Sequence, residues 1–197
     1  MLKFKQRIIE ISKKHKLSHL GSCFSVLPIL VDLYEKYKDE VIILSSGHAG
    51  LAQYVLLEHH FGFDAEHLLE KHGIHPGYDK DHKIYCSTGA LGSGLTVGVG
   101  YALAGMPTHC VISDGECAEG SIWEALTFIH DYKVDVDVHV NMNGFSAYKP
   151  VDMFYLTHRL KAFLPSINIW MTKNYPFDEG LSAHYCQVME EHEKKLC

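Results

Sequence analysis

A carboxylate and a side-chain amide follow two separate hydrophobic runs, in positions where they could hold a divalent cation together. Asp114 stands in a turn after the apolar run 110–112, and Asn143 stands in a turn after a run of alternating valines. With a loop carbonyl they form an all-oxygen ligand set, which suits Mg²⁺ or Ca²⁺ with phosphate oxygens in the remaining positions. Gly115 would let backbone N–H groups approach the same phosphates.

A helix and a strand are predicted between these two turns. Apolar residues at the i, i+3, i+4, i+7 spacing indicate one buried helix face, formed by Ile122, Ala125, Leu126 and Ile129. The alternation of valine over 134–140 indicates a strand. Strand, helix and strand make a right-handed βαβ unit, whose strand ends open on the ligand-binding edge of a parallel sheet. An ordinary βαβ unit with Asp and Asn as turn residues is the alternative.

The remaining chain repeats the alternation of helix and strand. A β-branched run at 41–44 leads into a turn with His48 and then a helix over 51–61 that Gly62 closes. Further helices are predicted at 3–16, from about 26 to 37, from Asp64 to 71, at 152–163 and at 187–195, with a strand at 167–171. This order predicts an α/β fold with a mostly parallel sheet.

The glycine-rich run 87–95 fits neither common nucleotide motif. A P-loop needs Lys and then Ser or Thr after its last glycine, where Leu95 stands. A Rossmann fingerprint needs G-x-G-x-x-G, and Gly92, Gly94 and Gly98 miss that spacing by one residue.

Bulk properties favour one soluble globular domain. The 197 residues are 47% hydrophobic and 21% charged. The net charge of -6 does not provide the excess of positive charge that is typical of nucleic-acid-binding proteins. No apolar run approaches membrane-spanning length, and MLKFKQRIIE lacks a signal-peptide core. Six scattered cysteines without C-x-x-C are expected to be reduced thiols, and 15 histidines include no zinc spacing. The expected compartment is the cytoplasm.

Several stretches resemble thiamine-diphosphate enzymes, in which GDG leads through a helix to NN or DNNG. The transketolase family is the branch that EGSIWEAL at 119–126 and NGFS at 143–146 resemble. STGALGSGLTVGVGYALAG at 87–105, SHLGSCFS at 18–25, SSGHA at 45–49 and the ending PFDEGLSAHY at 176–185 are similar to transketolase segments. The chain departs from the family pattern at Ser113, Leu20, Ser46 and Gly77.

The resemblance implies a fold and a set of site residues. The fold would be a three-layer sandwich, the diphosphate-binding (PP) module, with 1–197 forming a single domain shortened at its C-terminal end. The metal ligands would be Asp114, Asn143 and the backbone carbonyl of Phe145. Contacts to the cofactor would come from His48, Gly89, Leu91, Gly92, Gly115, Glu116, Asn143 and His184, and catalytic groups from His19, His48, His75 and Glu119.

The resemblance also implies an activity. The chain would be the N-terminal part of a split transketolase, moving a two-carbon ketol unit from a ketose to an aldose with thiamine diphosphate and Mg²⁺ or Ca²⁺. It would work only with a separately encoded C-terminal, pyrimidine-binding subunit. The two would form a heterotetramer acting on sugars or sugar phosphates, with no nucleic acid or membrane partner. Two alternatives stay open: another thiamine-diphosphate ketose synthase or lyase acting on a modified sugar, and a non-catalytic regulatory subunit that keeps the fold.

Overall fold

A four-stranded parallel sheet forms the centre of the computed structural model, which describes residues 1–146 and 149–172. Its strands run in the order β1 (Val41–Leu44), β2 (Thr108–Ser113), β3 (Asp137–Met142) and β4 (Asn168–Met171). Leu44 pairs with Val111, and Ser113 pairs with Asn141. The C-terminal ends of β1, β2 and β3 are therefore neighbours on one edge of the sheet, as the sequence predicts.

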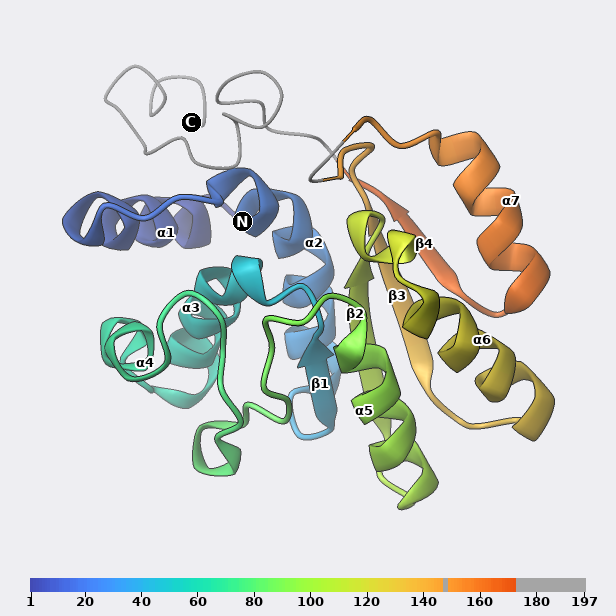
Figure 1. The fold of residues 1–197 in the computed structure, drawn as a ribbon. Helices are drawn as coiled ribbons and strands as arrows, with labels where there is room; N and C mark the ends of the chain where they lie inside the picture. Colours follow the sequence, from blue (N-terminus) through green and yellow to red (C-terminus); the bar gives the residue numbers. More distant parts are fainter. Residues whose placement is uncertain (147–148, 173–197) are drawn as a thin grey trace.

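Helices cover both faces of this sheet and complete three layers (Figure 1). One face carries α1 (Leu2–His15), α2 (Leu20–Tyr37), α3 (Gly50–Phe61) and α4 (Ala65–His72), and the other carries α5 (Ser93–Leu103), α6 (Gly120–Tyr132) and α7 (Met153–Phe163). Short 3₁₀ turns lie at η1 (Gly47–Ala49), η2 (Lys80–His82) and η3 (Gly115–Ala118). The predicted α/β fold class is confirmed.

Each face of the sheet has its own hydrophobic core, because successive strand residues point to opposite sides. Ile42 and Leu44 of β1 pack with the helices α1 to α4, whereas Val41 and Ile43 pack with α5, α6 and α7. Strands of a parallel sheet that are buried on both faces have unbroken apolar sequences, which is the pattern of 41–44 and 110–112. The two cores fix the sheet firmly between its helical layers.

Two predicted boundaries differ from the structure. Helix α2 begins at Leu20 and not near residue 26, because Leu20, Cys23, Phe24 and Leu27 already form a buried stripe at helical spacing. Strand β3 begins at Asp137 and not at Val134, whose N–H instead donates to Ile129 O (3.1 Å) and completes the end of α6.

The helix ends predicted at Gly62 and Asp64 are both capped. Asp64 accepts hydrogen bonds from the N–H groups of Glu66 (2.9 Å) and His67 (3.2 Å), so it is the N-cap of α4. Gly62 ends α3 in the left-handed conformation at φ 75°. The predicted helix at 187–195 and the segment around His184 lie outside the described residues.

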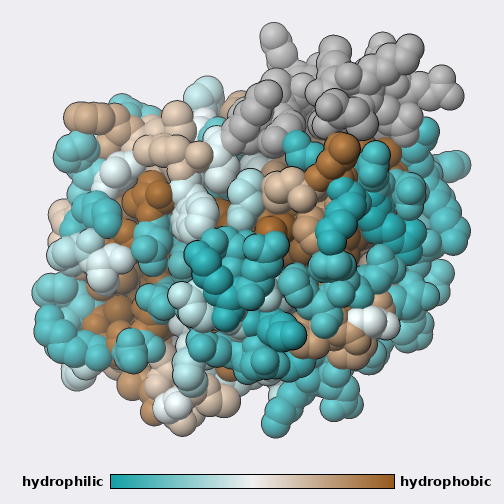
Figure 2. Space-filling model, turned by 180° about the vertical axis from the view of Figure 1, so that it is seen from behind, coloured by the Kyte–Doolittle hydropathy of each residue, from teal (hydrophilic) through white to brown (hydrophobic). Residues whose placement is uncertain are grey.

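Polar residues predominate over the side of the molecule that carries α1 and α4, on the right in the view from behind (Figure 2). Across the ranges 1–146 and 149–172, the helices are all too short or too polar to cross a bilayer.

His139 on β3 is a buried histidine that gives the fold a pH dependence. The indole N–H of Trp170 donates to its Nδ1 (3.2 Å), so the neutral ring is the form that fits. The pKa of His139 is lowered from 6.5 to about 4, chiefly by burial and secondly by the neighbouring His109, while Asp137 and Asp32 act in the opposite direction. A base with a lowered pKa in the folded state contributes stability above pH 6.5, and that contribution is lost as the pH falls through about 4.

We therefore expect wild-type protein to lose about 3 kcal/mol more unfolding free energy than the variant His139→Gln between about pH 7 and about pH 4. Glutamine cannot titrate, but it can still accept the indole N–H. Urea denaturation at several pH values measures the difference. Parallel pH curves for the two proteins would contradict this assignment.

Candidate functional site

A cavity of about 310 Å³ opens at the C-terminal ends of β1, β2 and β3. The sequence-predicted residues that line it are His19, His48, His75, Gly89, Leu91, Asp114, Gly115, Glu119, Asn143 and Phe145. They come from loops that are far apart in the chain and that the parallel sheet gathers at one edge. Most of the predicted site is thereby brought together.

Asp114 sits at the tip of β2 and is 3% exposed. Its Oδ1 accepts a hydrogen bond from the N–H of Gly115 (2.9 Å), and its Oδ2 accepts one from the N–H of Gly144 (2.6 Å) in the next loop. Burial raises the pKa of Asp114 to about 6, and the backbone N–H donors only partly offset that rise. A buried carboxylate held by backbone N–H groups is chemically suited to a metal ion, which would neutralise its charge.

Asn143 reaches the same cavity from the tip of β3. Its Oδ1 accepts a hydrogen bond from the N–H of Phe145 (3.0 Å), which fixes this oxygen within the loop. Asp114 contacts both ends of that loop, since its own N–H also donates to Asn141 O (3.1 Å). The carboxylate and the amide predicted to act together therefore belong to one hydrogen-bonded pair of loops.

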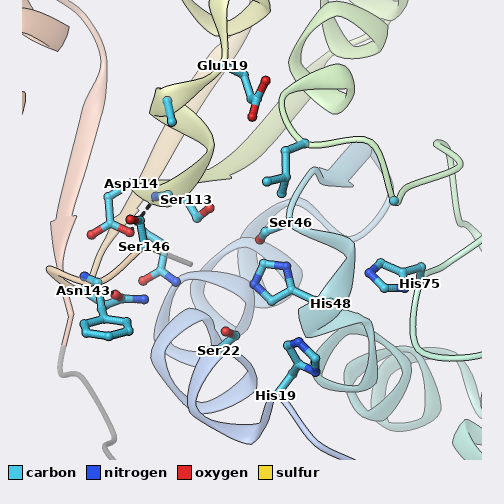
Figure 3. A pocket seen from close by; sticks show the side chains of 16 residues that line it. His19, Ser22, Ser46, His48, His75, Ser113, Asp114, Glu119, Asn143 and Ser146 are labelled. Carbon is cyan, nitrogen blue, oxygen red and sulfur yellow. Dashed lines mark hydrogen bonds between the residues drawn. The ribbon is translucent and has the colours of Figure 1, made fainter. Parts of the chain in front are cut away.

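Three imidazoles lie across the cavity from the Asp114–Asn143 pair (Figure 3). His19 and His48 have ring centroids 5.7 Å apart, and Ser22 and Ser46 lie between the imidazoles and the carboxylate side. His19 takes the left-handed backbone conformation, with φ 65°, at the start of α2, and its Nδ1 lies 2.8 Å from Ser18 Oγ. Three imidazole side chains thus face a carboxylate–amide pair across the cavity.

The loop that carries His75 is held by a buried carboxylate. Asp79 Oδ2 accepts hydrogen bonds from Lys71 (2.6 Å), His82 (2.8 Å) and His72 (3.1 Å). The loop also packs closely on η1, because a Cβ on Gly47 would lie 3.3 Å from the His75 ring and only 2.4 Å from Thr88 Cβ. A glycine at position 47 is therefore what allows this loop to approach His48.

Glu116 is a predicted cofactor contact that does not line the cavity. It is fully buried, and burial raises its pKa. It accepts hydrogen bonds from Ser45 Oγ (2.5 Å), the N–H of Gly92 (3.0 Å) and the N–H of Ser113 (2.9 Å). It therefore joins the loops that follow β1 and β2 to the start of α5.

Gly92 is held at this junction with φ 78°, a conformation that favours glycine, and it does not line the cavity either. His184, the last predicted cofactor contact, lies outside the described residues. Sequence reasoning missed Ser22 and Ser146, which line the cavity. The signal was available, because both serines belong to the stretches 18–25 and 143–146 that resemble the family.

Any metal at this cavity would depend on the Asp114 carboxylate together with amide and carbonyl oxygens. Over the described ranges, His, Cys, Asp and Glu do not gather in any group of three or more that could hold a metal. A carboxylate with neutral oxygen donors is the set that a hard cation such as Mg²⁺ takes when phosphate oxygens and water complete its shell.

Comparison with known proteins identifies relatives of the chain. No protein-family model matches it. It is 34% identical over 156 residues to an apulose-4-phosphate transketolase subunit of Phocaeicola vulgatus, and the match covers 68% of this chain and 55% of that protein. It is 27% identical over 177 residues to the 6-deoxy-6-sulfo-D-fructose transketolase subunit SqwG of a Clostridium species, covering 78% of this chain and 62% of that protein.

Human transketolase is 33% identical over an alignment of 141 residues, and the match covers 59% of this chain and 22% of the human protein. The chain thus spans little more than half the length of the bacterial transketolase subunits it matches and a smaller part of full-length transketolase. It is a relative of the transketolases, similar over most of its length to proteins named as single subunits of such enzymes.

Proposed function

We propose that the chain is the N-terminal, diphosphate-binding subunit of a split transketolase-like enzyme that transfers a two-carbon ketol unit from a ketose to an aldose. The observation that carries this proposal is the cavity that gathers Asp114, Asn143 and three histidines from separate loops. We propose further that residues 1–197 act as one diphosphate-binding domain. Thiamine diphosphate, when bound, supplies the nucleophilic carbon that receives the two-carbon unit.

The residues at the sheet edge fit the diphosphate and its metal. Asp114 and Asn143 would bind Mg²⁺ through a carboxylate and an amide oxygen, with the Phe145 carbonyl as a further ligand. Gly115 lines the cavity without a side chain, so its backbone could lie beside a phosphate. The raised pKa of Asp114 supports this assignment, because a bound cation would stabilise the ionised carboxylate that burial disfavours.

The three histidines would bind and orient the sugar. Imidazole both donates and accepts hydrogen bonds near neutral pH, so His19, His48 and His75 suit the hydroxyl groups of a ketose and could move protons to and from them. Glu119 is half-buried and lines the cavity. It would belong to a network of acidic side chains that extends to the partner subunit.

A separately encoded partner would complete the site. The relatives named as transketolase subunits support this, since such a name implies at least one further chain. We propose that this partner binds the pyrimidine end of the cofactor and that the two proteins assemble as a heterotetramer. The sugars named in the relatives differ from one another, and the proposed substrate is a sugar or sugar phosphate without further assignment.

Co-expression tests the proposal. The chain would be tagged, expressed with the products of the adjacent reading frames, purified, and assayed with thiamine diphosphate, MgCl₂ and a panel of ketose donors and aldose acceptors. We expect a second protein to co-purify and ketol transfer to require both chains. A complex that binds the cofactor but transfers no ketol unit would favour the non-catalytic alternative.

Replacing His48 by alanine should lower kcat of the reconstituted enzyme by about 100-fold, because a positioned acid–base group contributes on that order. The matched control is His67→Ala, an exposed histidine of α4, which should leave kcat unchanged. Steady-state kinetics and urea denaturation together separate turnover from folding. Equal kcat in wild type and His48→Ala would show that this imidazole takes no part in the reaction.

A further inference from the structure

The orientation of the Asn143 amide is set by two partners on opposite sides. At one end, the backbone N–H of Phe145 donates to Oδ1 (3.0 Å). At the other end, Nδ2 donates to the hydroxyl of Ser25 on α2 (3.3 Å). A backbone N–H can only donate, so the atom facing it must be the amide oxygen. The amide therefore has one fixed orientation, with its nitrogen toward α2.

Ser25 lies at the centre of this arrangement. Its side chain is 1% exposed, and its hydroxyl proton goes to Ser22 O (3.1 Å) in the same helix. With its only proton used, the oxygen can act toward other groups solely as an acceptor. It accepts from Asn143 and also from Nδ2 of Asn141 (3.0 Å), which uses both of its lone pairs.

A second hydroxyl completes the arrangement on the side of Asn141. Thr172 Oγ1 donates to Asn141 Oδ1 (2.5 Å), while the N–H of Thr172 donates to Met142 O (3.0 Å). Asn141 is 2% exposed, so an unpaired amide N–H there would be costly. Ser25 is thus the shared acceptor for two buried amides at the tip of β3.

We infer that Ser25 is a positioning residue that turns the Asn143 amide oxygen toward the cation proposed at Asp114. The inference rests on the proposed function. Accepting the Nδ2 hydrogen also draws electron density toward Oδ1, which makes that oxygen a better ligand for a hard cation. Sequence patterns do not reveal this role, since Ser25 precedes the predicted helix, and in the structure it does not line the cavity.

The test compares Ser25→Ala with Ser25→Cys in the complete two-subunit enzyme. Alanine removes the acceptor, whereas cysteine keeps the shape and offers only a weak acceptor. We expect Mg²⁺ to bind about tenfold more weakly to Ser25→Ala in the presence of thiamine diphosphate, with Ser25→Cys between alanine and wild type. Titration calorimetry with MgCl₂ measures the affinity, and the side-chain ¹⁵N–¹H signals of Asn143 should shift in both variants.

Ser12→Ala is the matched control, because Ser12 is a buried helical serine on α1, 2% exposed and away from the cavity. Its Mg²⁺ affinity should equal that of wild type. If Ser25→Ala does not fold, Ser25→Cys alone decides. Wild-type Mg²⁺ affinity in a folded Ser25 variant would overturn the inference.

The failure of the proposed function is distinguishable from the failure of this inference. If Asp114→Ala also keeps wild-type affinity for Mg²⁺ and thiamine diphosphate, the cation site itself is wrong. If Asp114→Ala loses binding while the Ser25 variants do not, the cation site stands and only the positioning role of Ser25 is rejected.

Discussion

Replacing Asp114 by alanine will weaken Mg²⁺-dependent binding of thiamine diphosphate by more than about 100-fold. Residues that merely orient metal ligands cost about 10–100-fold when removed, so loss of the only carboxylate proposed to contact the ion should cost more. The fold should survive the change. The N–H groups of Gly115 and Gly144 would lose their acceptor, which costs stability. Burial raises the pKa of Asp114 to about 6, so removing this carboxylate also relieves the cost of burying its charge and offsets part of that loss.

Calorimetry on the reconstituted complex measures this effect, with urea denaturation to confirm folding. Asp64→Ala is the control, since Asp64 is an aspartate that also accepts backbone N–H donors but caps α4 outside the cavity. It should lose about 1 kcal/mol of stability and keep its cofactor affinity. Unchanged affinity in Asp114→Ala would refute the metal assignment.

Replacing Glu116 by alanine will destabilise the chain by about 3–5 kcal/mol, because each buried donor that loses its acceptor costs about 1–3 kcal/mol. The N–H groups of Gly92 and Ser113 and the hydroxyl of Ser45 would all be left unpaired. Glu116→Gln keeps the shape and one acceptor oxygen, so it should fall between alanine and wild type.

The exposed residue Glu124 on α6 provides the control, and Glu124→Ala should change stability by no more than about 0.5 kcal/mol. Urea denaturation with unchanged m-values measures all three variants. If Glu116→Ala loses less than about 1 kcal/mol of unfolding free energy, then the loops after β1 and β2 and the start of α5 do not depend on this carboxylate for their stability.

The sheet edge was predictable because its signals are local. Unbroken apolar runs marked β1 and β2, and a polar turn after each strand marked the cavity side. Asp114 and Asn143 could be placed together without any contact information, since neighbouring parallel strands end at one edge. The start of α2 was missed because Gly21, Ser22 and Ser25 look like loop residues, while the apolar stripe that begins at Leu20 determines the helix.

The supporting polar contacts could not be predicted. Ser45 and Glu116 are separated by 71 residues, and Ser25 and Asn143 by 118. A hydrogen bond across such a distance leaves no periodic pattern, because it involves one atom of each residue and no repeated face. For the same reason, the resemblance placed Glu116 among the cofactor contacts, although its carboxylate turns inward to a junction of loops.

The backbone of His19 limits which amino acids this position can ever accept. With φ at 65°, a β-branched side chain would be strained before it made a single contact, whereas glycine, asparagine and aspartate tolerate such a turn. In a saturation library at position 19, the backbone conformation would therefore exclude many substitutions before the chemistry of their side chains could be compared. Asparagine, which keeps the turn but cannot exchange a proton, is the replacement that isolates what the imidazole contributes.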